Sequence, residues 1–389
     1  MKRIYLDHAA TTPADPKVVE AMMPYFSEIY GNPSSLHTFG QKAKSAVEEA
    51  RDKIASFVFA SPDEIVFTSG GTESDNFALK GTALARRNKG NHIITTAIEH
   101  HAVLETCHYL ETQGFQVTYL PVDRFGILDP INLKKAITDK TILISVMHAN
   151  NEIGSVQPIA EIGKIAGEKG IPFHTDAVQT FGHLPIDVRA LGVSLLSASA
   201  HKLYGPKGVG ILYVRKGIKI LPFMHGGEQE RGRRASTHNV AGIVGFGKAV
   251  ELAEKSLTED MEKNAGLRDR FLRELLGKID HTRLNGHPVE RLPNNVNVCV
   301  QYIEGEAVVL RLDMNGIACS SGSACSSSSM EPSHVLKAIG VPLELAHGAL
   351  RFSLGRHTSM DDIDRVLEVL PVIVEKLRSM SPLYKKAAC

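Results

Sequence analysis

An aspartate and a lysine follow two apolar runs in the middle of the chain. Asp176 closes the run IPFHTD, and Lys202 follows the run LLSASA within SAHKLYGPKG, next to a glycine-rich turn. A lysine amine can form a Schiff base with an aldehyde, and a carboxylate can keep a pyridine nitrogen protonated so that the ring accepts electrons. The two side chains are therefore those that a pyridoxal phosphate site needs, although a lysine taken alone is usually surface charge.

A turn that could bind the phosphate of such a cofactor lies earlier in the chain. In VFTSGGTESDNFALKG, a β-branched run ends in Ser69, Gly70, Gly71 and Thr72, and a helical pattern begins. Glycines let backbone N–H groups turn toward one point, and the helix N-terminus adds positive charge there. The plainer alternative is a strand, a turn and a helix that has Thr72 as its N-cap.

Three more motifs offer groups that could contact a cofactor ring. The motif EHHAVL holds His100 and His101, and an imidazole can stack on a ring or carry a proton near neutral pH. Asn151 in HANNEIG and Gln179 in DAVQ are neutral groups that suit a phenolate oxygen. Each of these residues has a structural alternative as a cap or a turn residue.

Two cysteines lie in the chain's one low-complexity stretch. The sequence GIACSSGSACSSSSME, residues 316–331, holds Cys319 and Cys325 among serines and glycines without helical or strand periodicity. Small polar residues pack weakly, so we expect a mobile segment that can present a thiol in two positions. This pair has no nearby histidine or further cysteine, and it lacks a four-ligand set, so we expect no resident metal. We expect Cys319 to be a small buried hydrophobe.

Strands and helices alternate around these motifs. Seven short apolar or β-branched runs lie between about residues 64 and 215, mostly separated by helical patterns such as 76–87 and 159–169. This order favours an α/β fold with a mostly parallel sheet between two layers of helices.

The pattern changes after residue 255. A charged helical pattern at about 256–279 precedes the strand NNVNVCVQ, the helix GEAVVLRLDM, the serine-rich stretch, the strand LRFSLG and a last helix from 360 to about 380. We expect a large domain over residues 13–255. Residues 1–12 and 256–389 should form a smaller α/β domain that carries the cysteine loop at about 319–331.

The composition limits the partners and the location of the protein. Lys and Arg number 44 and Asp and Glu 43, so the formal net charge of +1 leaves no basic excess that nucleic acid or an anionic membrane would attract. The N-terminal sequence MKRIYLDHAATTP contains no apolar run of signal-peptide length, and no stretch reaches the ~18 apolar residues of a membrane span. Five cysteines are odd in number and too sparse for a disulfide scaffold. We therefore expect a cytoplasmic protein that binds neither nucleic acid nor membrane.

Taken together, the motifs closely resemble those of one enzyme family. In order and spacing they are similar to the class I cysteine desulfurases of the nitrogen-fixation and iron–sulfur-cluster type, from Tyr5 to about Val366. The resemblance implies pyridoxal 5'-phosphate as cofactor, the fold type I architecture with a seven-stranded sheet, and a homodimer. It also implies that L-cysteine is converted to L-alanine and that the sulfur is transferred to the enzyme as a persulfide. The motifs are YLDHAATTP, GNPSS, TSGGTESDN, EHHAVL, HANNEIGSVQPI, HTDAVQ, SAHKLYGPKG, GGEQERGRR, SSGSACSSSSMEPSHVL and LRFSLGR.

The resemblance assigns a role to each matching residue. Lys202 matches the Schiff-base lysine, Asp176 the partner of the pyridine nitrogen and His100 the ring-stacking residue that acts as acid or base. Cys325 matches the nucleophile, which could also be a transient iron–sulfur ligand. The remaining matches are Gly71, Thr72, Ser199 and His201 for the phosphate, Asn151 and Gln179 for the ring and its phenolic oxygen, and Arg351 with Asn151 for the substrate carboxylate.

The sequence departs from the family pattern around one cofactor contact. Ser236 replaces the usual glycine before Thr237, which is expected to reach the phosphate of the neighbouring subunit's cofactor, and Glu228 stands where a glycine or serine is common. The chain ends in PLYKKAAC, without the longer tail that some relatives use to dock a scaffold protein. The sulfur acceptor, an iron–sulfur scaffold or another thiolated partner, therefore stays open.

Three other functions compete with this interpretation. An aminotransferase or a selenocysteine lyase on the same fold would share Lys202 and Asp176 but would not require Cys325 on a serine-rich loop. A metal-binding or cluster-binding protein would use Cys319 and Cys325, although two thiols are too few ligands.

Overall fold

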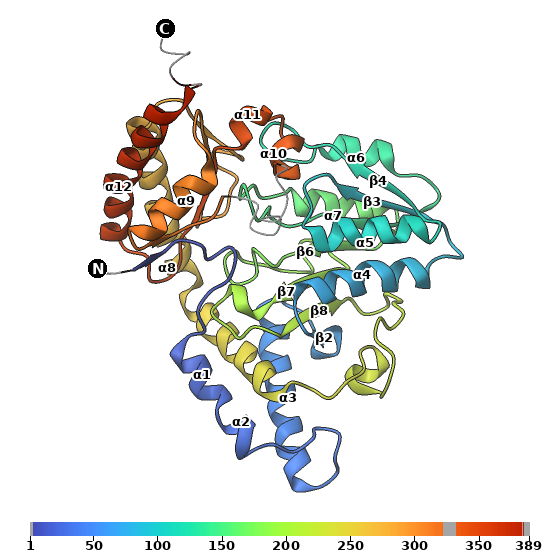
Figure 1. Ribbon diagram of the computed structural model, residues 1–389. Helices are drawn as coiled ribbons and strands as arrows, with labels where there is room; N and C mark the ends of the chain where they lie inside the picture. Colours follow the sequence, from blue (N-terminus) through green and yellow to red (C-terminus); the bar gives the residue numbers. More distant parts are fainter. Residues whose placement is uncertain (1–2, 322–331, 383, 385–389) are drawn as a thin grey trace.

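A seven-stranded sheet forms the centre of the larger part of the molecule (Figure 1). The computed structural model describes residues 3–321, 332–382 and 384. The strand order is β2-β8-β7-β6-β5-β3-β4, and β8 is antiparallel to both of its neighbours while the other pairs are parallel. The predicted mostly parallel sheet and the α/β class are confirmed. The strands are β2 (Ile65–Thr68), β3 (His92–Thr96), β4 (Gln116–Leu120), β5 (Thr141–Ser145), β6 (Phe173–Asp176), β7 (Leu195–Ser199) and β8 (Gly210–Val214).

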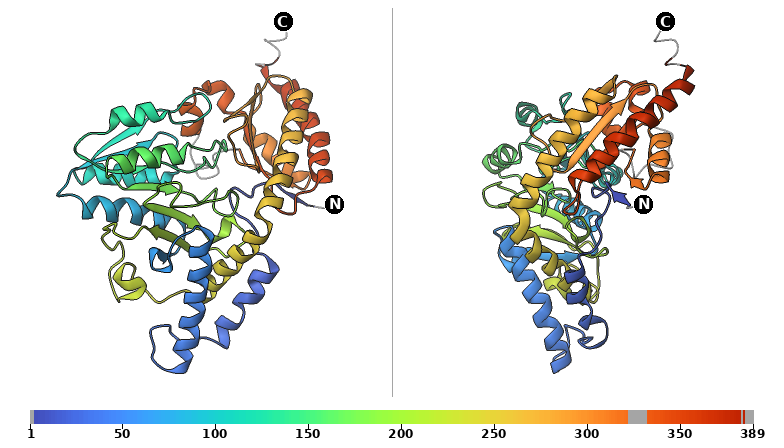
Figure 2. Two further views of the ribbon diagram at one scale, coloured as in Figure 1. Left: turned by 180° about the vertical axis from the view of Figure 1, so that it is seen from behind. Right: turned by 90° about the vertical axis from the view of Figure 1, so that its left-hand side faces the viewer.

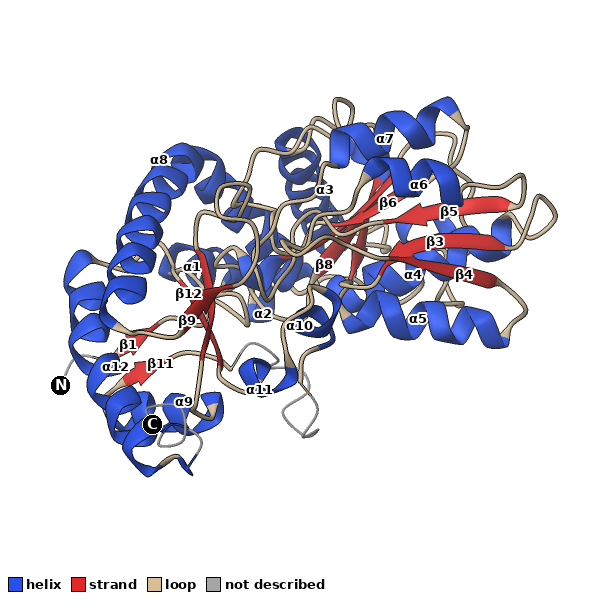
Figure 3. Ribbon diagram, turned by 90° about the horizontal axis from the view of Figure 1, so that it is seen from above, coloured by secondary structure: helices blue, strands red, loops and turns tan. Residues whose placement is uncertain are grey.

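Helices cover both faces of this sheet (Figure 3). Successive residues of a strand point to opposite faces, so Val66 belongs to the core under α4 (Gly71–Ala85) and α5 (His101–Thr112), while Phe67 belongs to the core on the other side. Helices α3 (Thr38–Phe57), α6 (Pro130–Ala136) and α7 (Ile159–Glu168) contribute to that second core. Both faces of the sheet are covered, so every strand except the edge strand β4 is buried along its whole length, in agreement with the predicted apolar and β-branched runs.

Helix α8 (Val240–Lys278) begins well before the predicted start near residue 256. The glycines in AGIVGFGKAV have poor helix propensity and concealed the first turns. They allow close packing, because a Cβ on Gly245 would lie 2.6 Å from the Met22 sulfur and one on Gly247 would lie 2.8 Å from the Ala50 Cβ. Met22 ends α1 (Pro16–Met22), which is followed by the short α2 (Pro24–Ser27). Figure 2 shows α8 running from beside α3 to α12. The helix passes through residue 255, where the sequence predicts the domain boundary, and that boundary stays a prediction.

The smaller part of the molecule has its own core. Strand β10 (Asn295–Val300) lies between the antiparallel strands β9 (Thr282–Leu284) and β12 (Ala349–Ser353), and β1 (Ile4–Tyr5) pairs parallel with β11 (Ile317–Ala318). Helices α9 (Gly305–Met314) and α12 (Met360–Met380) agree with their predicted ranges. Cys319 is 8% exposed and lies in this core, which confirms the expectation of a small buried hydrophobe.

Short elements join the two parts. Helices α10 (His334–Ala338) and α11 (Leu343–Ala346) lie between the small sheet and the large one (Figure 3). Their apolar residues share a core with Ile98 and Met147 of the large part and with Cys299 of β10. Three 3-10 turns complete the described structure: Pro62–Glu64, Ala200–Lys202 and Gln229–Gly232. No helix in the described ranges has the length and apolar character to cross a lipid bilayer.

Candidate active site

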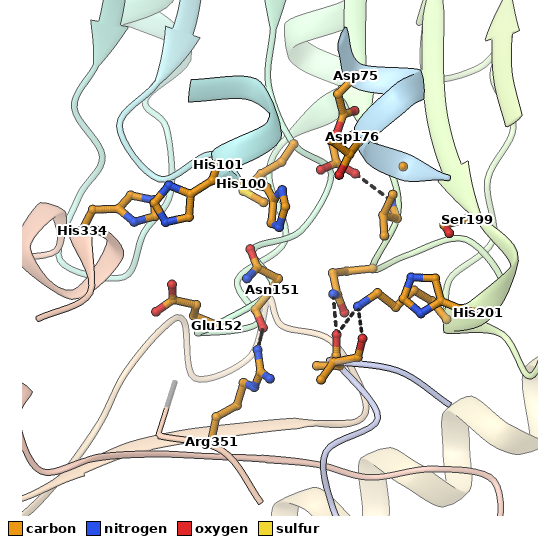
Figure 4. Close-up of a pocket in the computed structure, with 18 residues that line it drawn as sticks. Asp75, His100, His101, Asn151, Glu152, Asp176, Ser199, His201, His334 and Arg351 are labelled. Atoms are coloured by element: carbon orange, nitrogen blue, oxygen red, sulfur yellow. Dashed lines mark hydrogen bonds between the residues drawn. The ribbon is translucent and has the colours of Figure 1, made fainter. Parts of the chain in front are cut away.

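A cavity of about 420 Å³ opens where β6 and β7 end, facing α4, the N-terminal segment and the small part of the molecule (Figure 4). In an α/β sheet, ligands bind outside the carboxyl ends of the strands, and this cavity lies there. Most residues that the sequence nominated line its wall. They are Gly71, Thr72, His100, Asn151, Asp176, Gln179, Ser199, His201, Lys202 and Arg351.

Lys202 points its amine into the cavity. It ends the 3-10 turn that follows β7, and its Nζ donates to the carbonyl oxygens of Ala9 and Ala10, the latter at 2.8 Å. The residue therefore lies in the cavity wall and is not one of the exposed surface lysines. By contrast, Lys207 is exposed.

Asp176 is the last residue of β6, and its carboxyl group is buried. Its Oδ1 accepts a hydrogen bond from the Val178 N–H at 2.9 Å. Burial raises the pKa of Asp176 to about 6, while that hydrogen bond and the charge of Lys202 act in the opposite direction. A cationic N–H placed against this carboxylate would offset the burial and stabilise the ionised form. The chemistry of this group therefore fits a protonated pyridine nitrogen.

The first turn of α4 presents backbone N–H groups to the cavity. The helix begins at Gly71 with Gly70 as its N-cap, so the alternative in which Thr72 is the N-cap is wrong. Gly70 has φ 155, and a Cβ on Gly71 would lie 2.7 Å from the Val178 Cγ2, so both positions suit glycine. Within the described residues, the N–H groups of Gly71 and Thr72 have no hydrogen-bond acceptor. This terminus, with Ser199 beside it, fits a phosphate group.

His201 lies beside that terminus. Its Nδ1 is 3.1 Å from the Thr11 hydroxyl, and burial together with the charge of Lys202 lowers its pKa to about 4. The ring is therefore neutral at pH 7 and offers hydrogen bonds, not charge.

His100 is the N-cap of α5. Its Nδ1 accepts a hydrogen bond from the Ala102 N–H at 3.1 Å. Burial, with smaller contributions from Lys202 and His101, lowers the pKa of His100 to about 4. In the neutral ring, the proton must therefore reside on Nε2, because Nδ1 is the acceptor.

Arg351 reaches the cavity from β12 and is held by two oxygens. One terminal nitrogen donates to Asp7 Oδ1 at 2.9 Å and the other to the Asn151 carbonyl oxygen at 3.0 Å. Its Nε is buried, and no hydrogen-bond partner for it exists in the described part of the chain. The guanidinium is thus fixed in orientation and retains N–H groups for a carboxylate.

Sequence reasoning missed two buried acids in the cavity wall. Burial and the charge of Asp176 raise the pKa of Asp75 well above its usual range. The Oδ1 of Asp75 has no hydrogen-bond partner among the residues that the structure describes. Glu152 accepts a 2.5 Å hydrogen bond from the Ser333 hydroxyl, and burial raises its pKa to about 7. The helical spacing of Asp75 with the apolar Ala78 and Leu79 was a signal for the first. No sequence signal pointed to Glu152, because its partner Ser333 lies far along the chain.

Thr237 lies outside this cavity, on an exposed part of the segment after the 3-10 turn Gln229–Gly232. Ser236 has φ 99, a backbone conformation that favours glycine. The preceding turn is anchored by Glu230, which accepts from both terminal nitrogens of Arg51 at 2.7 and 2.8 Å and lies 2.7 Å from His238 Nε2. The segment is therefore well fixed despite the serine.

From the sequence, Cys325 is expected to be the nucleophile, and no resident metal is expected. Cys325 lies outside the described residues, as does Cys389. Within the ranges that the structure describes, no three His, Cys, Asp or Glu side chains are grouped so that they could hold a metal ion.

Comparison with known proteins gives consistent matches along the whole chain. The family model described as aminotransferase class-V matches residues 4–366. The protein named cysteine desulfurase IscS from Dictyoglomus turgidum is 59% identical over 387 residues, 99% of this chain and 98% of the relative. A protein of the same name from Methanosarcina thermophila is 60% identical over 385 residues, 99% of this chain and 95% of the relative.

Solved structures agree with these matches. A structure described as a NifS-like protein has a TM-score of 0.91 and 40% identity, and the match covers 96% of this chain and 100% of that chain. A structure described as SspA in complex with cysteine has a TM-score of 0.80 and 40% identity, over 92% of this chain and 100% of that chain.

Proposed function

We infer that this chain, which belongs to the aminotransferase class-V family, is a cysteine desulfurase that converts L-cysteine to L-alanine and supplies the sulfur for iron–sulfur cluster assembly or other thiolation. The observation that carries this function is the meeting of Lys202 and Asp176 on one cavity in a chain so similar, over its full length, to cysteine desulfurases. The fold is that of the NifS-like structures.

We propose pyridoxal 5'-phosphate as the cofactor. The N–H groups of Gly71 and Thr72 would bind its phosphate together with Ser199 and His201. Asp176 would hold the ring nitrogen protonated, and Lys202 would bind the aldehyde carbon. When bound, the cofactor supplies an electron sink that stabilises negative charge on the carbon next to the substrate amine.

Gln179 and Asn151, which line the same cavity, could contact the cofactor ring. Gln179 donates its amide N–H to the Ala9 carbonyl at 3.0 Å, and so has an acceptor oxygen and a second N–H for the phenolic group. Asn151 lies on the wall beside His100 and is suited to the ring and to the substrate (Figure 4). The hydrogen on Nε2 would make His100 a hydrogen-bond donor toward the cofactor ring. Of the two roles that the resemblance implies, acid and base, the neutral ring would therefore fit the acid role better.

The substrate carboxylate would bind Arg351 with Asn151. The planar fork of arginine matches a carboxylate, and its burial strengthens the interaction. Lys202, once the substrate amine has taken its place, would take the proton from the substrate Cα, since it is the amine at the cavity wall.

We propose Cys325 as the nucleophile that accepts the sulfur. The alternative thiol in the same motif, Cys319, is buried in the core, and burial raises its pKa to about 12, so it is poorly suited to attack. The attacking thiolate forms a bond to the substrate sulfur, the bond from Cβ to sulfur breaks, and Cβ receives a proton to give alanine.

We further propose a homodimer. Large apolar side chains are exposed along the segment from α1 to α3, next to the surface hollow that Thr237 lines. A contiguous exposed apolar surface of this kind indicates a protein interface. A second copy on this face would bring Thr237 toward the neighbouring cofactor phosphate. The exposed side chains are Met23, Phe26, Tyr30, Leu36 and Phe39.

The partners and location complete the proposal. L-cysteine is the substrate, and an iron–sulfur scaffold protein or another sulfur acceptor takes the persulfide sulfur. Cys107 and Cys299 are buried free thiols, which suits a reducing compartment, so we propose the cytoplasm.

The function is tested by assaying the loaded enzyme on L-cysteine and on selenocysteine with a reductant. We expect equal amounts of alanine and sulfide from L-cysteine, and loss of both in Lys202→Ala together with the visible absorbance of the lysine-bound cofactor. The matched control Lys207→Ala should keep both. Near-zero activity on L-cysteine beside high activity on selenocysteine would identify a selenocysteine lyase instead.

A further inference from the structure

The turn at residues 151–153 carries Asn151 into the cavity wall and rests on the small part of the molecule. The carbonyl oxygens of all three residues accept hydrogen bonds from side chains of the small part. The first, that of Asn151, accepts from Arg351 at 3.0 Å, and the third, that of Ile153, accepts from Arg291 at 3.2 Å. A buried turn must find partners for such oxygens, and here the small part supplies them.

The middle oxygen, that of Glu152, accepts from two asparagine side chains. The amide nitrogens of Asn295 and Asn297 lie 3.1 and 3.0 Å from it, and the two residues are 1% and 0% exposed. A carbonyl oxygen has two lone pairs, so both are used. The contact is close, because a Cβ on Gly154 would lie 2.7 Å from the Asn295 Oδ1. The turn and β10 are therefore fitted to each other.

Strand β10 presents these two amides because of its alternating sequence. In NVNVCV, Asn295 and Asn297 alternate with Val296 and Val298, and successive residues of a strand point to opposite faces. The valines belong to the core of the small part, so the asparagines face the turn. A buried amide costs free energy unless it forms hydrogen bonds, so a polar face of this kind indicates a specific partner.

The register of β12 on β10 places Asn297 beside Arg351. The two residues are directly opposite each other in the antiparallel pair. The Asn297 Oδ1 accepts a hydrogen bond from the Asn285 side chain at 2.7 Å, which orients the amide with its N–H groups toward the turn. One cross-strand pair thus holds the consecutive carbonyl oxygens of Asn151 and Glu152.

The substrate carboxylate needs groups from both sides of this contact. Arg351 comes from β12 and Asn151 from the turn, and both line the cavity. Two groups bind one carboxylate well only when their separation is fixed before the ligand arrives, because ordering them on binding costs free energy. The hydrogen bonds to the turn fix that separation.

We propose that Asn297 is a positioning residue for the substrate carboxylate. Together with Asn295, it holds the turn at residues 151–153 against the small part, so that Asn151 and Arg351 meet one carboxylate. The proposal rests on the function inferred above, which assigns those two residues to the substrate.

The variant Asn297→Ala tests this proposal at equilibrium. The loaded enzyme is titrated with L-alanine and with ethylamine, which has the amine but no carboxylate, and binding is followed by the cofactor absorbance. We expect the dissociation constant for L-alanine to rise about tenfold, because a hydrogen bond that orients the carboxylate site is lost. The dissociation constant for ethylamine should stay within about twofold of wild type. In turnover, KM for L-cysteine should rise by a similar factor to that for L-alanine, while kcat changes little.

Asn294→Ala is the matched control. Asn294 is a buried asparagine next to β10, and its side chain donates to the Leu354 carbonyl within the small part at 3.3 Å. This substitution also removes a buried amide, but the turn is not involved. We expect wild-type dissociation constants for both ligands, and the melting temperatures show whether each variant is folded.

A second variant, Asn295→Ala, removes the other donor to the Glu152 carbonyl and decides the question if Asn297→Ala does not fold. It should show the same selective loss for L-alanine. Unchanged affinity for L-alanine in the folded variants, or an equal loss for ethylamine, overturns the proposal. If the wild-type absorbance responds to neither L-alanine nor L-cysteine, the function inferred above fails instead.

Discussion

The guanidinium of Arg351 and the carboxylate of Asp7 meet at 2.9 Å across 344 positions of the chain. Asp7 follows β1, and Arg351 lies in β12, so the N-terminal segment and the small part together fix the group proposed to bind the substrate carboxylate. The side chain of Arg351 is 3% exposed and that of Asp7 is 20% exposed. Water therefore screens the pair only weakly, and its orientation is part of the site.

The variant Asp7→Asn tests this orientation. Loss of the charged partner should raise KM for L-cysteine about tenfold, with a smaller effect on kcat, because one charge-assisted hydrogen bond is replaced by a neutral one. Steady-state rates over a range of L-cysteine concentrations measure both quantities. Asp361→Asn, which changes an exposed acid in the first turn of α12, should leave KM unchanged. An unchanged KM in Asp7→Asn would show that Arg351 needs no such partner.

The variant Asp176→Asn tests the role of the buried carboxylate. Asparagine can keep the hydrogen bond from the Val178 N–H, but it carries no charge to hold a ring nitrogen protonated. We expect the cofactor to remain bound through its phosphate, while kcat falls by at least about 100-fold. The cofactor absorbance and alanine formation separate the two effects. Wild-type turnover in this variant would contradict the assignment.

The variant Ser236→Gly should stabilise the protein. Ser236 has φ 99, which glycine adopts without steric cost, so we expect about 1 kcal/mol of added stability. The melting temperature measures the change. Ser45→Gly is the matched control, because Ser45 is exposed within α3 and the same substitution there should lower stability by about 0.5 kcal/mol or more. A decrease in both variants would mean that the serine at 236 carries no strain.

The variant Glu99→Gln tests a buried acid behind the cavity. Burial raises the pKa of Glu99 to about 8, although the Thr96 hydroxyl and the Met147 N–H donate hydrogen bonds to it. The unfolded chain loses this proton near pH 4.3, so the folded protein loses stability as the pH rises from there toward 8. Glutamine imitates the protonated acid and removes this dependence. We therefore expect the melting temperature of the variant, relative to wild type, to rise by a few degrees between pH 5 and pH 8.

The same melting curves contain the contrary outcome for Glu99. If the carboxyl group is ionised in the folded protein, the glutamine variant loses a charged acceptor. Its melting temperature should then lie below that of wild type by a constant amount from pH 5 to pH 8.

Local pattern was enough to predict the sheet and much of the site. The strands are apolar runs bounded by turn residues, so their existence follows from burial on both faces. Most of the nominated residues that line the cavity lie at strand ends, in the turns that follow them or at helix starts, whereas Arg351, which only the family resemblance nominated, lies within β12. The predicted helices Gly305–Met314 and Met360–Met380 have clear periodicity and agree with the structure.

Features that depend on contacts between distant parts of the chain could not be predicted from the sequence. The start of α8 was missed because its glycines fit against α1 and α3, which no local pattern reveals. Glu152 and Ser333 are 181 positions apart, and His334 contacts the Glu99 carbonyl, 235 positions away. Thr72 was a reasonable N-cap by residue type, but Gly70 is the N-cap and the helix begins at Gly71, two residues earlier than a Thr72 cap would place it.

The most direct test of the account is the fate of the sulfur atom in a single turnover. The loaded enzyme is mixed with one equivalent of L-cysteine without reductant, alanine is quantified, and the digested protein is analysed by mass spectrometry. We expect one added sulfur atom on the peptide that contains Cys325, in the same amount as alanine, and none on Cys319. Alanine formed without sulfur on Cys325 would contradict the central claim.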